Sequence, residues 1–201
     1  MRGPAMKPNA LARAHDALAP SPWVARHAHL VPKGARVLDL ACGYGRHARL
    51  VARCGARVLA VDRDADALAA IDGVPGIETC RIDLEASAWP FAGERFDAIV
   101  VSNYLHRPAL AHIVAGVADD GALLYATFAR GNQAYGRPSN PAFLLEPGEL
   151  LAAVGRRLTV VEFAQGSTVC NGRHAVVQRI AAVGLRRQWP PELAPEERGS
   201  L

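Results

Sequence analysis

The stretch VLDLACGYGRHARLVARCGARVLAVDRD (residues 37–64) decides the fold, because it joins a short apolar run, a Gly-x-Gly turn, a helical pattern and a second apolar run. The apolar runs ARVLDLA (35–41) and RVLAVD (57–62) predict two strands that are buried on both faces. Between them, GRHARLVARCG (45–55) predicts a helix that ends at Gly55. Two strands joined by a helix form a parallel pair with a crossover, which is the repeating unit of open α/β sheets.

The same alternation continues through most of the chain. The pattern predicts further helices at 63–73, 107–117 and 146–155, and further strands at 77–83, 96–103, 121–128, 158–166 and 174–184. Too few residues separate the last two strands for a crossover helix, so we expect a hairpin that places one antiparallel strand at or near an edge. The predicted fold class is α/β and Rossmann-like, with a seven-stranded, mostly parallel sheet flanked by helices and one antiparallel strand from a C-terminal β-hairpin.

The chain is expected to divide into three parts. Residues 1–33 form an N-terminal arm with a short helix, residues 34–184 form the α/β domain, and residues 185–201 form a polar tail. In the first part, the segment SPWVARHAHLV places Trp23 near one helical face, where it either covers a ligand or packs in the core.

Composition limits the class of protein. Half of the 201 residues are apolar, which is enough to bury a core without metals or disulfides. The net charge is +4 and the pI is near 9.1, but the arginines are scattered, which favours a solvated, mildly basic surface over a nucleic-acid interface. No run approaches the ~20 apolar residues of a membrane span, and the N-terminus has no apolar signal region, so we expect a cytoplasmic protein.

Four cysteines occur without Cys-x-x-Cys spacing or a matching histidine pair, so we expect buried, reduced thiols and no metal site: Cys42, Cys54, Cys80 and Cys170.

The turn after the first strand predicts a nucleoside ligand. Gly43 and Gly45 let the chain turn tightly and approach a ligand closely, and the following helix presents free N–H groups. The second strand ends at Asp62, whose carboxylate can accept two hydrogen bonds from a ribose diol. An adenosine-type cofactor fits this arrangement.

Two further acids separate this site from a dinucleotide fingerprint. Ala48 satisfies the third position of the NAD pattern Gly-x-Gly-x-x-Gly/Ala, so an NAD-dependent oxidoreductase is an alternative. However, Asp39 lies inside the first strand, where an unpaired buried carboxylate is costly unless it holds a polar ligand group. Asp83 ends the third strand and precedes Leu84, which together supply a polar group and an apolar wall for adenine.

On these residues the sequence resembles the class I S-adenosylmethionine-dependent methyltransferases over about residues 34–184. VLDLACGYGRHA (37–48) is similar to the family's first motif, RIDLEASAWPF (81–91) to its adenine-contacting segment, and FDAIVVSNYLHRP (96–108) to its fourth motif. The segment FARGNQAYGRPSNPAFLLEPGELL (128–151) resembles small bacterial methyltransferases of the tellurite-resistance type.

The resemblance implies S-adenosylmethionine as cofactor, S-adenosylhomocysteine as product, and a role for each matching residue. The methionine and ribose portion would lie near Asp39 and the backbone of Ala41, Gly43 and Gly45, and Asp62 would bind the ribose hydroxyls. Arg63, Asp83 and Leu84 would contact the adenine. The sulfonium would lie above Ser102 or Asn103. Tyr104 and His106 would lie beside the acceptor.

A general base is needed only if the acceptor is a neutral hydroxyl or amine. His106 and His174 are the candidates, although a lone histidine is often a packing residue. The polar 130–146 loop, which carries Tyr135, is either a surface connection or an acceptor wall, and its Arg130 and Arg137 would attract an anion.

The expected partner is a small-molecule acceptor, with anions and chalcogen oxyanions among the candidates. We expect no stable nucleic-acid binding, no membrane association, and a monomer or homodimer. RNA or protein methylation is an alternative, but the fourth strand lacks an Asn/Asp-Pro-Pro-Tyr motif and no Pro-Cys follows it. A protein that binds the cofactor without turnover is the other alternative. The sequence leaves the acceptor atom open among O, N, S, Se and Te.

Overall fold

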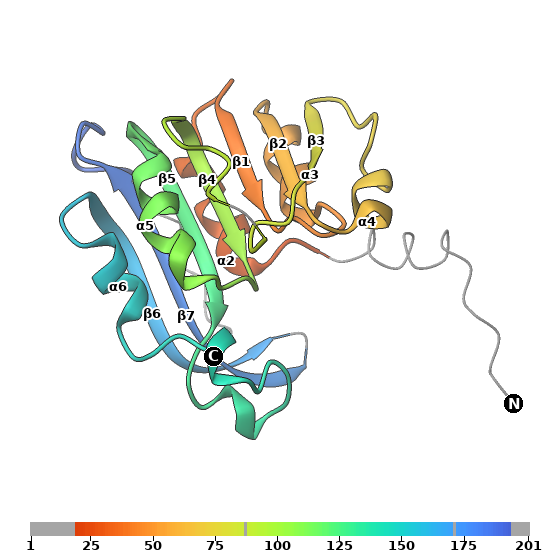
Figure 1. Ribbon diagram of the computed structural model, residues 1–201. Helices are drawn as coiled ribbons and strands as arrows, with labels where there is room; N and C mark the ends of the chain where they lie inside the picture. The colour runs from red at the N-terminus through yellow and green to blue at the C-terminus, as the bar shows by residue number, and fades with distance from the viewer. Residues whose placement is uncertain (1–18, 87, 171, 194–201) are drawn as a thin grey trace, which may run out of the picture.

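A twisted seven-stranded sheet forms the centre of the molecule in the computed structural model, which describes residues 19–86, 88–170 and 172–193 (Figure 1). The strand order is β3-β2-β1-β4-β5-β7-β6. The strands are β1 (Arg36–Leu40), β2 (Arg57–Asp62), β3 (Ile77–Arg81), β4 (Phe96–Ser102), β5 (Val117–Phe128), β6 (Leu158–Cys170) and β7 (Arg173–Gly184). Only β7 runs antiparallel to its neighbours β5 and β6, so the predicted fold class is confirmed.

Helices cover both faces of the sheet, as Figure 1 shows. One face carries α5 (Arg107–Gly116) and α6 (Glu149–Val154), and the other carries α2 (Pro22–His27), α3 (Arg46–Arg53) and α4 (Ala65–Ala69). Because side chains alternate along a strand, Leu38 and Leu40 pack in the core under α5 and α6, whereas Val37 packs in the core under α2 and α3. Asp39 therefore points to the α3 face.

The order of strands places the site. β1 pairs in parallel with both β2 and β4, so the strand order reverses beside β1. Ligands of open α/β sheets bind at such a point, beyond the carboxyl ends of the strands. The turns that follow β1, β2, β3 and β4 all meet at this edge.

The last two strands differ most from the prediction. The predicted strands end at 166 and begin again at 174, but both strands extend further, and Ser167 to Cys170 pair with Arg173 to Val176. The physical reason is the Asn-Gly pair at 171–172, a sequence typical of two-residue hairpins, in which Gly172 adopts a φ of +73°. The resulting long hairpin extends past the carboxyl edge of the sheet.

Other boundaries shift without changing the topology. The predicted helices 45–55, 63–73 and 146–155 are each shorter in the structure, whereas the strand expected at 121–128 already begins at Val117. The expectation of buried thiols holds for Cys42 but is wrong for Cys54, which caps the end of α3 on the solvent side. Cys80 is half-buried, and the side chain of Cys170 lies outside the described residues.

The segment before β1 packs on the sheet. Trp23, Val24 and Leu30 are buried in the core beneath α2 and the short 3-10 helix η1 (Ala28–Leu30). After β7, Arg187 donates hydrogen bonds to the carbonyls of Asp120 and Leu30. The division of the chain into three parts stays a prediction. None of the helices among the described residues has the length and apolar character that crossing a bilayer requires.

Candidate active site

The turn after β1 has the backbone that its glycines predict. Ala41, Gly43 and Gly45 adopt φ values of +51°, +54° and +70°. A Cβ on Gly45 would lie 2.8 Å from two side-chain atoms of Ile71, so this position packs the turn against its neighbour. A Cβ on Gly43 would meet no protein atom within 4 Å, so the space above Gly43 is open to a ligand.

Asp62 at the end of β2 fixes this turn. Its Oδ2 accepts a hydrogen bond from the backbone N–H of Gly43 at 2.7 Å, and its Oδ1 accepts one from the N–H of Asp64 at 2.9 Å. Each carboxylate oxygen has a further lone pair, so Asp62 can still accept from a diol. The carboxylate is half-buried and lines a cavity.

Asp39 lies behind the same turn and is 1 % exposed. Burial raises the pKa of its carboxyl to about 7, although a hydrogen bond from the backbone N–H of Ala48 and the charge of Arg46 act in the opposite direction. Its Oδ2 has no hydrogen-bond partner among the described residues. A buried acceptor without a partner is costly, and a polar ligand group would satisfy it.

A cavity of about 220 Å³ lies where β1, β2 and β3 end. It is lined by Ala41, Asp62, Arg63, Ile82, Asp83, Leu84, Glu85 and Tyr104. Leu84 is buried and forms an apolar wall, whereas Asp83 is exposed and accepts a hydrogen bond from the N–H of Glu85 at 3.0 Å. The cavity thus combines Asp62 at the end of β2 and the acids that follow β3 with one apolar wall.

Tyr104 lines this cavity, which is the smaller of two at the site. The family resemblance instead places Tyr104 beside the acceptor. Its hydroxyl is buried and has no hydrogen-bond partner among the described residues. Burial, with the negative charges of Glu85 and Asp83, raises the pKa of this phenol to about 12. At neutral pH the hydroxyl is therefore a hydrogen-bond donor and acceptor, not a base.

A larger cavity of about 520 Å³ lies on the other side of the turn. It is lined by Ser21, Pro22, Trp23, Arg46, Ser102, Asn103, Ala126, Phe128, Asn132, Tyr135, Gly136, Arg137, Arg173, His174, Ala175, Val177 and Arg179. Five predicted site residues meet here: Ser102 at the end of β4, Asn103 after it, Tyr135 and Arg137 from the loop after β5, and His174 from β7. The rings of Tyr135 and His174 stack with centroids 5.6 Å apart. His106, the N-cap of α5, lines neither cavity.

The charge in the larger cavity is of one sign. Four arginines line it (Arg46, Arg137, Arg173 and Arg179), and no Asp or Glu does. Arg46 donates a hydrogen bond to the Ser102 hydroxyl at 3.3 Å. The other three form no ion pair with any described residue. Arg130, expected to attract an anion, instead pairs with Glu146 at 3.0 Å and lines neither cavity.

A buried histidine positions the wall that α2 contributes. The backbone N–H of Ser21 donates to Nε2 of His47 at 3.1 Å. Burial lowers the pKa of His47 to about 3, with a smaller effect from Arg46, so the ring stays neutral and accepts this bond. Trp23, which follows at the cavity wall, is 6 % exposed, and its indole N–H has no hydrogen-bond partner among the described residues.

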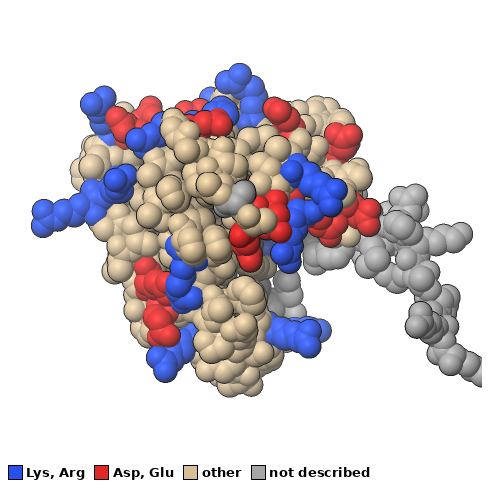
Figure 2. Space-filling model, viewed as in Figure 1, with Lys and Arg blue, Asp and Glu red and all other residues tan. Residues whose placement is uncertain are grey.

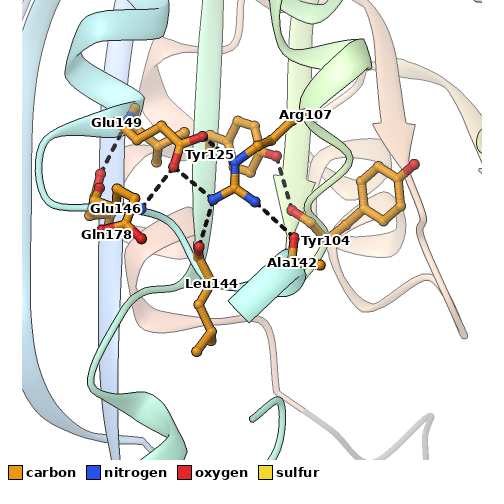
Figure 3. Close-up of polar contacts among 9 residues, drawn as sticks. Tyr104, Arg107, Tyr125, Ala142, Leu144, Glu146, Glu149 and Gln178 are labelled. Atoms are coloured by element: carbon orange, nitrogen blue, oxygen red, sulfur yellow. Dashed lines mark hydrogen bonds and ion pairs between the residues drawn. The ribbon is translucent and has the colours of Figure 1, made fainter. Parts of the chain in front are cut away.

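A polar network holds the segment between β5 and α6, as Figure 3 shows. Arg107 donates two hydrogen bonds to Glu149, at 2.7 and 2.9 Å, and one each to the carbonyls of Ala142 and Leu144. The Tyr125 hydroxyl donates to the carbonyl of Tyr104 at 2.9 Å, while the Tyr104 ring points away from the network.

The start of this segment is tied to β7. The N–H of Ala129 donates to the carbonyl of Val176 at 2.8 Å, and the N–H of Val176 donates to the Asn132 side chain at 3.1 Å. The 130–146 loop is therefore fixed at both ends and forms one wall of the larger cavity.

Three arginines of the larger cavity were not predicted as site residues: Arg46, Arg173 and Arg179. Arg46 follows Gly45 directly and was interpreted only as part of a helix. The two arginines of β7 share one strand face with Ala175 and Val177, and this alternation is a signal that the sequence contains. No group of three or more His, Cys, Asp or Glu in the described part of the chain could hold a metal ion.

Comparisons with known proteins agree on the fold. Residues 37–119 match the family described as a methyltransferase domain. No curated protein matches the chain in sequence. TehB from Haemophilus influenzae is similar in structure with a TM-score of 0.72 and 18% identity, covering 90% of this chain and 68% of that chain.

Two other solved structures are similar. A TehB-like SAM-dependent methyltransferase from Corynebacterium glutamicum has a TM-score of 0.58 and 22% identity, covering 88% of this chain and 93% of that chain. The N-methyltransferase NodS from Bradyrhizobium japonicum has a TM-score of 0.56 and 20% identity, covering 79% and 94%. These likenesses show a shared fold.

Proposed function

We propose that the protein, whose residues 37–119 match the methyltransferase-domain family, transfers a methyl group to a small anionic acceptor. The cofactor is S-adenosylmethionine. The proposal rests on one observation: the glycine turn lies between two cavities, a smaller one with three acids among its lining residues and a larger one lined by four arginines. Asn103 and Tyr104 are neighbours in sequence, yet Asn103 lines the larger cavity and Tyr104 the smaller. A ligand that lies across the turn reaches both.

The residues present fit this cofactor. In the smaller cavity, Asp62 would accept from the ribose hydroxyls, Asp83 from the exocyclic amine of adenine, and Leu84 and Arg63 would flank the ring. At the turn, the open space above Gly43 would admit the methionine portion.

The partnerless Oδ2 of Asp39 and the backbone of Ala41 and Gly45 complete this part of the cofactor site. Ser102 and Asn103 would lie beneath the sulfur, at the entrance to the larger cavity.

The cofactor supplies a methyl group on a positively charged sulfur, and its transfer forms one bond from acceptor to carbon, breaks one carbon–sulfur bond and leaves neutral S-adenosylhomocysteine. The task of the chain is to hold the acceptor in line, which can supply much of the rate increase. The arginines of the larger cavity concentrate an anion there, since no acidic side chain lines the cavity to oppose it. For a neutral nucleophile, His174 is the predicted base in the cavity, but it lies five residues along β7 from Arg179, in whose row Ser102 lies.

The experiment is a methyl-release assay with the full chain. Labelled S-adenosylmethionine is mixed with a metabolite panel that includes selenite and tellurite, and label is sought on each acceptor. Calorimetry with S-adenosylhomocysteine and with NADH runs alongside it. We expect S-adenosylhomocysteine to bind and label to appear on an anionic acceptor. Binding of NADH alone would support the oxidoreductase, and binding without any methyl release would support a protein that binds the cofactor without turnover. Cytoplasmic localisation and the monomeric or dimeric state stay predictions.

A further inference from the structure

We infer that the methyl acceptor is an organic anion with a flat, unsaturated body, whose charged group binds at Arg137 and Arg173 while its reacting atom lies near Ser102. This inference rests on the proposed function and narrows its acceptor class. It is carried by the length of the larger cavity, the placement of its charges and its aromatic wall.

The floor of the cavity is one face of β7. Arg173, Ala175, Val177 and Arg179 are alternate residues of this strand and all line the cavity. At about 3.3 Å per residue, the two arginines are separated by roughly 20 Å along the strand. The floor therefore carries a cation at each end and small apolar side chains between them.

The inner end of this floor faces the cofactor. Arg179 pairs with Ala126 of β5, and Ala126 pairs with Ser102 of β4, so Arg179 lies in the row of residues that ends at the cofactor site. Arg46 reaches the same place through its hydrogen bond to Ser102. These two cations would hold the carboxylate of the cofactor's methionine portion.

The outer end is too remote for that role. Val177 pairs with Phe128, the last residue of β5, and Arg173 lies four residues further out, or about 13 Å. Arg137 follows Tyr135, whose ring stacks on His174 next to Arg173. A ligand that uses these outer cations and also reaches Ser102 must span much of the cavity, and an inorganic oxyanion cannot.

The wall between the two ends suits a flat ligand. Tyr135 is 53 % exposed although it is a large aromatic residue, and its ring stacks on His174 at the cavity rim. Phe128 and the small exposed part of Trp23 add aromatic surface. Aromatic faces bind flat, unsaturated groups by offset stacking.

Size and charge agree with this occupant. About 520 Å³ is within the range of cavities that hold small organic ligands. Arginine forms paired hydrogen bonds with a carboxylate or a phosphate, so either group would serve as the anchor.

The test measures binding of defined probes to the full chain saturated with S-adenosylhomocysteine. The probes are two-ring molecules long enough to reach from the outer arginines toward Ser102, namely 4'-hydroxybiphenyl-4-carboxylate, biphenyl-4-yl phosphate and the neutral 4'-hydroxybiphenyl-4-carboxamide, together with selenite, each measured by calorimetry. We expect at least one aromatic anion to bind ten times more tightly than the amide and than selenite. In the double variant Arg137→Gln/Arg173→Gln, that affinity should fall at least tenfold, with S-adenosylhomocysteine binding within twofold of the original protein. Arg156→Gln, at an exposed position on the opposite edge of the sheet, is the matched control.

The outcomes separate the inference from the proposed function. If S-adenosylhomocysteine does not bind, the proposed function fails. If it binds but the aromatic anions bind no more tightly than the amide or selenite, only the organic-anion inference fails. An aromatic anion that binds equally well to the double variant also overturns it.

Discussion

The carboxylate of Asp62 links the turn after β1 to the end of β2, because one oxygen accepts from Gly43 and the other from Asp64. The same carboxylate faces the smaller cavity. A residue that shapes a turn and also contacts a ligand must be tested by a change that keeps its size. Removing the whole side chain would mix the two effects.

Asp62→Asn should weaken binding of S-adenosylhomocysteine at least tenfold, or about 1.5 kcal/mol, since an amide cannot accept on both sides. Calorimetry on the purified variant gives this value. Asp72→Asn, at an exposed position after α4, is the control and should bind as the original protein does. If the Asp62→Asn variant bound S-adenosylhomocysteine as tightly as the original protein, Asp62 would not be the residue that binds the ribose.

His47 gives the protein a defined dependence of stability on pH. Its pKa is about 3 in the folded protein, below the usual value of 6.5. Between these values the unfolded chain binds more protons than the folded one, so this group's contribution is fully present above pH 6.5 and is lost as the pH falls. Asp39, whose folded pKa is raised to about 7, acts with the opposite sign from about pH 4 upward.

We therefore expect His47→Asn to cost most at pH 7.5, and the difference in unfolding free energy from the original protein to shrink toward pH 5 by at most about 1.4 kcal/mol per pH unit. The contribution of Asp39 is present in both proteins and cancels. Urea unfolding at pH 7.5, 6 and 5 measures the difference. Two stability curves that stay parallel would mean that His47 does not titrate as its burial indicates.

Some structural features of this protein could be predicted from the sequence and others could not. The strands β1 and β2, the glycine turn and the acids at the strand ends follow from local pattern, because apolar runs and turn residues act over a few positions. The larger cavity does not, since Arg46, Tyr135 and Arg179 come from segments that meet only when β7 inserts between β5 and β6. The length of the hairpin was missed because its polar residues resembled a loop, although Asn-Gly marked the turn.

Arg107 holds the segment between β5 and α6 in place, because its guanidinium group donates hydrogen bonds to Glu149 and to two backbone carbonyls at once. Arg107→Lys keeps the charge but cannot make the paired contacts. We expect the amide protons of residues 141–149 to exchange faster with solvent and the acceptor KM to rise, while cofactor binding is unchanged. Hydrogen exchange and steady-state kinetics measure these effects.

Arg130→Lys is the matched control, because Arg130 makes one exposed ion pair with Glu146 in the same segment. It should leave both quantities as they are. Equal effects of the two substitutions would show that the network around Arg107 has no special part in holding the wall.

Charge over the whole molecule decides between a small acceptor and RNA. On the face seen in Figure 2, Lys and Arg side chains lie interspersed with Asp and Glu and form no continuous basic patch. Several surface arginines are paired with acids, including Arg36 with Glu94 and Arg186 with Asp119. Arg137, Arg173 and Arg179, which form no ion pair with a described residue, line the larger cavity, where a duplex or an extended strand has fewer contacts than a small anion.

RNA binding through phosphates releases counterions, and the logarithm of its affinity falls with the logarithm of salt by roughly 0.7 to 0.9 per phosphate contact. If two of the four cations in the cavity face the cofactor as proposed, two remain there to contact a phosphate chain. We expect filter binding of a mixed-sequence RNA to be weak, with a salt slope shallower than about −2 between 50 and 200 mM. A slope near −6 would require a basic surface outside the cavity, and it would favour RNA methylation over a small acceptor.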